Sequence, residues 1–137
     1  MQALDLFPWP IPPGELRPPR WNGQTFEIDG RASRVLIYQA SDSHWSDDLT
    51  SLHETEAGHD HLIDRASRRL AISSMKRIVA DSPIILDAGC SSGFVLDDLL
   101  RELPKANLVG ADYLRGPLET IARRMPSIPI LQFDLRK

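Results

Sequence analysis

The 137-residue sequence has one cysteine, no long hydrophobic run and no excess of positive charge. A single cysteine excludes an internal disulfide and fits a reducing compartment. The N-terminus lacks a basic region followed by a hydrophobic core, and no apolar run reaches the length of a membrane span. A formal net charge of −3 argues against nucleic acid, whose binding requires a basic face. We therefore expect a cytoplasmic protein with neither a membrane nor a nucleic-acid partner.

The sequence also lacks the glycine pattern G-x-G-x-x-G that holds a pyrophosphate at a helix N-terminus. In its place, a short apolar strand over 84–86 leads into the turn Asp87-Ala88-Gly89-Cys90-Ser91-Ser92-Gly93, and a helical pattern follows over 94–103. The carboxylate of Asp87 would repel phosphate but suits an ammonium or a hydroxyl. A nicotinamide-dependent oxidoreductase is therefore the less favoured alternative, and we expect a polar, partly cationic ligand without phosphate.

The two glycines of this turn have mechanical tasks. Gly89 permits a positive φ and close approach of a ligand to the backbone, and Gly93 lets the helix begin close to the strand. We expect free backbone N–H groups of the turn to point at the ligand. A thiolate nucleophile at Cys90 is an alternative, because a helix N-terminus lowers the pKa of a thiol.

Residues 87–93 resemble motif I (D-x-G-x-G-x-G) of the class I S-adenosylmethionine-dependent methyltransferases, with Ser91 where the family most often has its middle glycine. The resemblance implies a Rossmann-like α/β fold with S-adenosyl-L-methionine as cofactor. It implies that Cys90 has a packing role, since cysteine is common here in the family. The cofactor-binding residues that it places in this turn are Asp87, Gly89, Cys90, Ser91 and Gly93.

Two further strands end in acids. The segment 107–112 ends at Asp112, 19 positions after Gly93, where a carboxylate is placed to bind both hydroxyls of a ribose. The segment 128–134 ends at Asp134. By resemblance, Tyr113 lies against the adenine face, Asp134 accepts from the adenine amino group, and the amide of Leu135 reaches a ring nitrogen. Helix capping or strand termination explains any one of the three aspartates, but not the set.

Two helices surround these strands in the expected fold. Gly116-Pro117 begins a helix after the second strand, and a helix over 62–79, with Asp60 as N-cap, precedes the first strand. We expect the inward stripes Leu118, Ile121, Ala122 and Met125 in the former and Ile63, Ala66, Leu70, Met75 and Val79 in the latter.

The N-terminal part divides into two regions before the cofactor domain at 61–137. Residues 1–23 form a proline-rich arm, expected to be extended or disordered, which either docks through Phe7, Trp9 and Trp21 or is held loosely. Residues 24–60 contain an expected hairpin, with strands over 25–28 and 34–38, and a lid-like segment.

The segment 41–64 is rich in acids and histidines. A metal site would use His53, His59 and His61, but no pair has a tight metal-finger spacing, so no metal is predicted. The favoured interpretation is a polar segment before a helix. Segments in this position often cover the cofactor in methyltransferases, and Trp45, His53 and Glu54 are hypothetical acceptor-positioning or proton-accepting residues. Catalytic residues are otherwise unassigned.

The expected fold class is α/β: the first half of a doubly wound Rossmann-like methyltransferase sheet, with parallel strands in order 3-2-1 and flanking helices. It is preceded by the proline-rich arm and the small β-hairpin. The expected function is methyl transfer from S-adenosylmethionine to an unidentified acceptor, either a small molecule or a sugar. The alternative is an inactive cofactor-binding or assembly fragment, completed by a partner or a longer chain. The unpaired side of the strand over 84–86 invites self-association.

Overall fold

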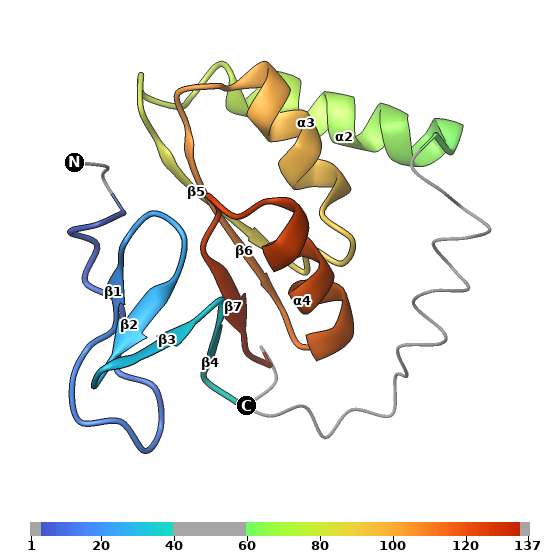
Figure 1. Ribbon diagram of the computed structural model, residues 1–137. Helices are drawn as coiled ribbons and strands as arrows, with labels where there is room; N and C mark the ends of the chain where they lie inside the picture. The colour runs from blue at the N-terminus through green and yellow to red at the C-terminus, as the bar shows by residue number, and fades with distance from the viewer. Residues whose placement is uncertain (1–3, 40–59, 135–137) are drawn as a thin grey trace.

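The computed structural model describes residues 4–39 and 60–134 (Figure 1). A small antiparallel sheet contains β1 (Arg20–Trp21), β2 (Phe26–Ile28) and β3 (Arg31–Ser33). The rest of the described chain forms a second sheet and the helices that pack on it: β4 (Val35–Ile37), α2 (Leu62–Met75), β5 (Ile84–Ala88), α3 (Phe94–Glu102), β6 (Asn107–Asp112), α4 (Arg115–Arg124) and β7 (Ile130–Gln132).

The second sheet is parallel, with strand order β4-β7-β6-β5. Strands β7, β6 and β5 are the third, second and first strands after the N-terminal region, so the expected order 3-2-1 is confirmed. The register aligns Ala88 with Ala111 and Ala111 with Leu131. The carboxyl ends of all three strands therefore meet at one edge of the sheet.

The expected hairpin is shorter than predicted, and its second strand was placed wrongly. Asp29 and Gly30, both at positive φ, turn the chain so that β3 begins at Arg31. The segment predicted to complete the hairpin leaves it and forms β4, which pairs in parallel with β7. This arrangement buries Val35 and Leu36 in the larger sheet, where both faces are covered.

The two faces of the parallel sheet are covered by different parts of the chain, as Figure 1 shows. Leu108 and Ile130 point into a core with α2, α3 and α4, whereas Val109 and Leu131 pack against the arm and the small sheet. Successive strand residues point to opposite faces. On the helical face, a Cβ at Gly110 would lie 2.9 Å from side-chain carbons of Leu96 and Ile130, so glycine allows α3 to lie close to the sheet.

The described part of the proline-rich arm packs against the rest of the protein, as expected if it docks through its aromatic residues rather than being held loosely. Leu4, Trp9 and Trp21 are almost completely buried, and the indole N–H of Trp9 donates to the carbonyl oxygen of Leu4 at 3.3 Å. The ring of Phe26 in β2 lies 5.1 Å from that of Trp9 and 4.8 Å from that of Trp21. The aromatic residues therefore attach the arm to the second face of the sheet.

The inward face of α2 differs from the predicted stripe. Asp60 is not its N-cap, since His61 occupies that position, and the helix ends at Met75 rather than at residue 79. Ile63 and Leu70 are each 70% exposed, and Ala66 is also exposed. The buried residues are Arg68 and Ile72.

The reason for the different face lies in α3. Arg68 donates to the carboxylate of Asp98 at 2.7 Å, and its guanidinium lies 5.8 Å from the centre of the Phe94 ring. These contacts favour burial of a charged residue that hydrophobic periodicity assigns to solvent.

No helix of the described residues is long and apolar enough to span a membrane.

Candidate functional site

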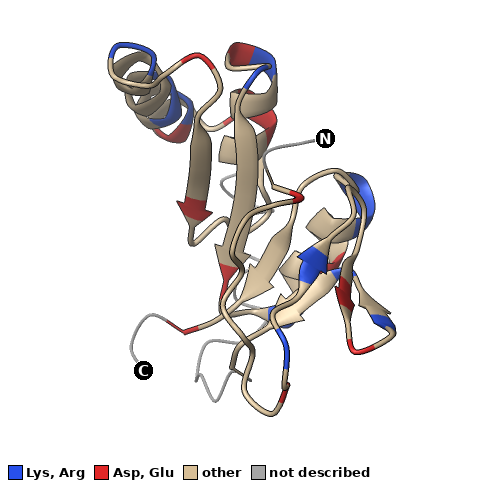
Figure 2. Ribbon diagram, turned by 90° about the vertical axis from the view of Figure 1, so that its left-hand side faces the viewer, with Lys and Arg blue, Asp and Glu red and all other residues tan. Residues whose placement is uncertain are grey.

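A pocket of about 180 Å³ lies where β5, β6 and β7 end. Figure 2 shows acidic residues at the carboxyl ends of strands in the parallel sheet. The pocket includes four of the residues predicted from the sequence, Gly89, Asp112, Tyr113 and Asp134. Its other lining residues are Ala88, Ala111 and Phe133.

The sequence interpretation missed Ala88, Ala111 and Phe133. Phe133 has a recognisable signal, because it is an aromatic residue directly before the acid that follows a strand. Ala88 and Ala111 are partners in adjacent strands, and their small side chains leave room at the strand ends. The pocket is therefore mainly apolar inside, with Asp112 and Asp134 at its wall.

Asp112 organises the pocket through backbone contacts. One carboxylate oxygen accepts from the amides of Tyr113 at 2.7 Å and Leu114 at 3.2 Å. The other accepts from the amide of Ser91, in the glycine turn, at 2.9 Å. A carboxylate oxygen can accept two hydrogen bonds, so the oxygen that bonds Ser91 is the one with room for a ligand hydroxyl.

The glycine turn presents fewer amides than we expected from the sequence. The amides of Gly89 and Cys90 donate to the carbonyl oxygen of Ala111 at 2.8 and 2.9 Å, and that of Gly93 donates to the carbonyl oxygen of Cys90 at 2.7 Å. With Ser91 bonded to Asp112, the expectation of free amides is wrong for these four residues. Between Gly89 and Gly93, the amide of Ser92 is the one without a hydrogen-bond acceptor among the described residues.

Asp87, the first residue of the predicted glycine turn, lies in β5. One oxygen of its carboxylate is buried with no hydrogen-bond partner among the described residues. Burial, and secondarily the negative charge of Asp112, raise the pKa of Asp87 above its ordinary value. An unsatisfied buried acceptor is costly and rare, so this carboxylate fits a ligand that brings a donor or a positive charge.

Cys90 is buried beneath the same turn. Burial, followed by the charges of Asp87 and Asp112, raises the pKa of its thiol. The thiol therefore stays protonated at neutral pH, which argues against the nucleophile alternative. Its sulfur packs near Gly110, where a Cβ would lie 3.4 Å from it. This contact supports the packing role.

Ser91 has φ +44°, in the left-handed region that disfavours residues with a Cβ. We expect Ser91→Gly to raise the free energy of unfolding by about 1 kcal/mol or less, because relief of strain is partly offset by the greater freedom of glycine in the unfolded chain. Urea unfolding of both proteins measures this. Ser92→Gly is the matched control, because Ser92 is not at positive φ and glycine there should destabilise. Equal destabilisation by both substitutions would contradict the strain argument.

The other predicted residues lie elsewhere. Leu135, Trp45, His53, Glu54 and His59 are outside the described residues. Of the predicted turn residues, Asp87, Cys90, Ser91 and Gly93 support the pocket without being among its lining residues. The part of the chain at 4–39 and 60–134 contains no group of three or more His, Cys, Asp or Glu side chains that could hold a metal ion.

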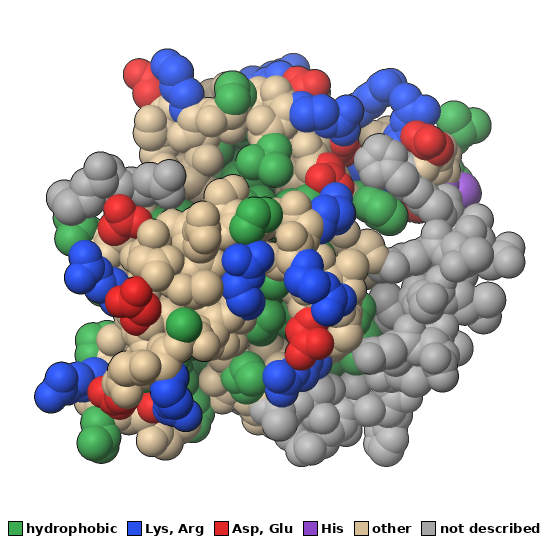
Figure 3. Space-filling view, in the orientation of Figure 1, with side chains coloured by type: hydrophobic (Ala, Val, Ile, Leu, Met, Phe, Trp, Pro, Cys, Tyr) green, Lys and Arg blue, Asp and Glu red, His purple; other side chains and the backbone are tan. Residues whose placement is uncertain are grey.

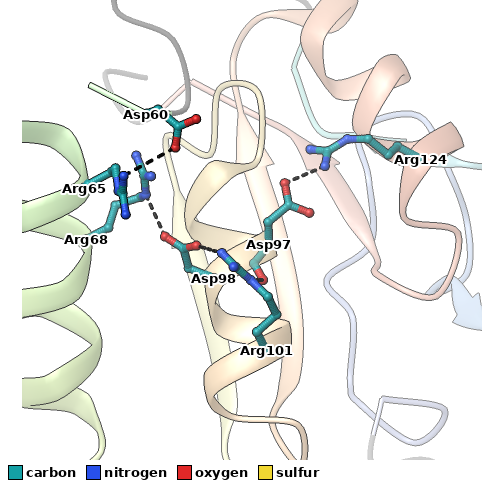
Figure 4. Close-up of polar contacts among 7 residues, drawn as sticks. All are labelled: Asp60, Arg65, Arg68, Asp97, Asp98, Arg101 and Arg124. Carbon is teal, nitrogen blue, oxygen red and sulfur yellow. Dashed lines mark hydrogen bonds and ion pairs between the residues drawn. The ribbon is translucent and has the colours of Figure 1, made fainter. Parts of the chain in front are cut away.

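A larger groove of about 410 Å³ lies between α2 and α3. Several of its charged side chains pair with one another. Arg68 and Arg101 both contact Asp98, as Figure 4 shows. Lys76 contacts Glu102 at 2.5 Å. Figure 3 shows basic and acidic side chains interspersed over the described part of one face. Ion pairs between side chains of the groove therefore connect the two helices, and the groove shares no lining residue with the pocket at the strand ends.

Three comparisons with known proteins bear on the site. No family model matches the chain. The trans-aconitate 2-methyltransferase of Acidovorax sp. (strain JS42) is 31% identical over 68 residues, which are 49% of this chain and 26% of the relative. The malonyl-[acyl-carrier protein] O-methyltransferase of Anoxybacillus flavithermus (strain DSM 21510 / WK1) is 35% identical over 63 residues, 46% of this chain and 24% of the relative. The chain thus spans about a quarter of the length of the curated relatives that it matches.

One solved structure has the same fold over most of the chain. It is the crystal structure of the plantazolicin methyltransferase BpumL in complex with a pentazolic desmethylPZN analog and SAH. The TM-score is 0.52 at 17% identity, and the match covers 67% of this chain and 37% of that chain. This likeness shows the Rossmann-like α/β fold expected from the sequence.

Proposed function

We propose that this chain, a relative of the class I S-adenosylmethionine-dependent methyltransferases, binds S-adenosylmethionine at the carboxyl ends of β5, β6 and β7. The observation that carries the proposal is the meeting of three strand ends around one pocket, with Asp112 and Asp134 at its wall and the glycine turn beside it. The curated relatives, which are all named as methyltransferases, support the same chemistry.

The residues present fit the cofactor. Tyr113 and Phe133 offer ring faces beside an apolar pocket of a size suited to a nucleobase. Asp134 accepts a hydrogen bond from the adenine amino group, and Asp112 accepts one from a ribose hydroxyl. The unpartnered carboxylate oxygen of Asp87 suits the positive charge or amino group of the methionine part. Leu135 lies outside the described residues, so the role of its amide as a donor to a ring nitrogen stays a prediction from the sequence.

When bound, S-adenosylmethionine supplies a methyl group already activated on a sulfonium, so alignment and exclusion of water are the main tasks left to the protein. The proposed acceptor is a small molecule. The named substrates of the relatives differ from one another, and they select no particular acceptor for this chain.

An alternative is that the chain is a cofactor-binding half completed by further sequence or a partner. Among the described residues β5 pairs only with β6, and Ile84 and Leu86 are 46% and 51% exposed. This favours the alternative, because such a strand is expected to be covered. Sedimentation at increasing protein concentration tests completion by a second copy of the chain. A concentration-dependent dimer supports self-association through this edge, and a monomer at every concentration argues against it.

Titration of S-adenosylhomocysteine by calorimetry tests the cofactor proposal. The folded chain should bind it, and Asp134→Asn should weaken binding by about tenfold, because one acceptor of the adenine amino group is replaced by a donor. The matched control is Asp81→Asn, at an exposed position between α2 and β5. A folded chain that does not bind, or equal binding by the two variants, would reject the proposed site.

A further inference from the structure

Arg124, the last residue of α4, connects the glycine turn to α3. One guanidinium nitrogen lies 2.5 Å from the carboxylate of Asp97 in α3, and the other donates to the carbonyl oxygen of Ser92 at 2.6 Å. Figure 4 shows the Arg124 and Asp97 side chains directed toward each other. The planar guanidinium can make both contacts at once, and both are charge-assisted.

The carbonyl that Arg124 holds belongs to the peptide unit that leads into α3. The N–H of the same unit is that of Gly93, which donates to the carbonyl oxygen of Cys90 at 2.7 Å. This peptide plane is therefore fixed at both ends. A Cβ at Gly93 would lie 3.1 Å from the guanidinium, so the contact also depends on glycine at this position.

The next peptide unit back in the chain carries the amide of Ser92, the one amide of the turn without an acceptor in the described residues. On its other side, the amide of Ser91 is held by Asp112 at 2.9 Å. The direction of the Ser92 amide is thus set between two anchors, Asp112 from β6 and Arg124 from α4. The Asp97 carboxylate neutralises Arg124, so the anchor adds little net charge beside the site.

We propose that Arg124 is a positioning residue for the cofactor: it holds the carbonyl of Ser92 away from the pocket and so fixes the Ser92 amide toward the ligand. The inference rests on the proposed function for the identity of the ligand. Arg124 contributes by ordering the turn before binding, which lowers the entropic cost of binding.

Amide hydrogen exchange on the ligand-free chain tests whether Arg124 orders the glycine turn. Arg124→Met should accelerate exchange of the Gly93 amide by about tenfold, because the peptide unit loses one of its two anchors. Arg123→Met is the matched control: Arg123 is on the same helix, and its guanidinium donates to the hydroxyl of Thr120 at 3.4 Å, on α4 itself. Wild-type exchange at Gly93 in Arg124→Met would overturn the proposal.

Calorimetry with S-adenosylhomocysteine tests whether Arg124 strengthens ligand binding. Arg124→Met should raise the Kd by about tenfold, with Arg124→Lys between it and the wild type, since lysine can keep one of the two contacts. Arg123→Met should bind as the wild type does. If Arg124→Met does not fold, the intermediate affinity and exchange of Arg124→Lys decide the question.

The outcomes separate the two proposals. Wild-type binding that Arg124→Met and Arg124→Lys leave unchanged overturns the role of Arg124 and leaves the cofactor site standing. A folded wild-type chain that fails to bind overturns the proposed function and the cofactor role of Arg124 together. Faster exchange at Gly93 in that case would still establish that Arg124 orders the turn.

Discussion

Asp112→Ala is expected to lower the free energy of unfolding by about 3 to 5 kcal/mol and to abolish measurable binding of S-adenosylhomocysteine. Asp112 is 9% exposed and accepts from three backbone amides. Its removal leaves the buried amide of Leu114 and the partly buried amides of Tyr113 and Ser91 without this acceptor. Two of these amides shape the end of β6, and the third belongs to the glycine turn. Urea unfolding and calorimetry measure the two effects.

Asp112→Asn separates the two tasks of this side chain. Its amide oxygen can still accept from Tyr113 and Leu114, but its NH₂ group would then face the amide of Ser91, which needs an acceptor. We therefore expect a smaller loss of stability than with alanine, together with a large loss of ligand affinity. Tight binding by either variant would show that the turn does not depend on Asp112 and would remove this residue from the proposed ribose contact.

Asp87→Asn is expected to change stability and binding in opposite directions. In the folded protein without ligand, one carboxylate oxygen of Asp87 is buried and unpartnered, so removal of the charge should raise the free energy of unfolding by about 1 kcal/mol at neutral pH. The same change removes the negative charge that the proposed cation requires. Binding of S-adenosylhomocysteine, which keeps the amino group, should therefore weaken by about tenfold or more.

The pH dependence of stability gives an independent check on Asp87. Because its pKa is raised on folding, the folded state retains the proton at higher pH than the unfolded chain does. The stability that comes from the protonated form is fully present below the ordinary pKa of aspartate and is lost as the pH rises through the raised value. Asp87→Asn should remove this loss, which urea unfolding measures as the pH is raised above about 4, the ordinary pKa of aspartate.

Glu27→Gln is a suitable control, since Glu27 is an exposed carboxylate on β2. Its pH profile should follow that of the wild type. If Asp87→Asn destabilises the ligand-free protein at neutral pH, then the carboxylate has a stabilising partner and the proposed role of its unsatisfied oxygen is wrong. If only binding changes, the residue acts on the ligand without strain in the empty site.

Residues near one another in the sequence made the centre of this fold predictable. The strands that end near Asp87, Asp112 and Asp134 follow from apolar runs, turn glycines and the distance between acids, all of which are local signals. The stripe of α4 was correct for the same reason, because Leu118, Ile121 and their partners have helical spacing and are buried.

Long-range contacts were not predictable in this way. The pairing of β4 with β7 joins Val35 to Ile130, and only the assembled sheet provides the partner. Burial of Arg68 depends on Asp98 and Phe94 of another helix, so the periodicity of α2 alone indicated the wrong face. The use of turn amides by Ala111 and Asp112 likewise depends on contact with β6. Each of these three differences from the sequence prediction therefore involves a contact with a residue distant in the sequence.

The parallel pairing of β4 with β7 has a consequence for where the α/β unit begins. A protein cut before residue 61, at the start of the motif-bearing region, would lose β4 and the aromatic layer of Trp9, Trp21 and Phe26. The edge of β7 would then be unpaired, and Val109, Ala111 and Leu131 would face water. Phe133 packs against that layer and also lines the pocket at the strand ends, so shortening the chain from its N-terminus would expose a wall of the proposed cofactor site.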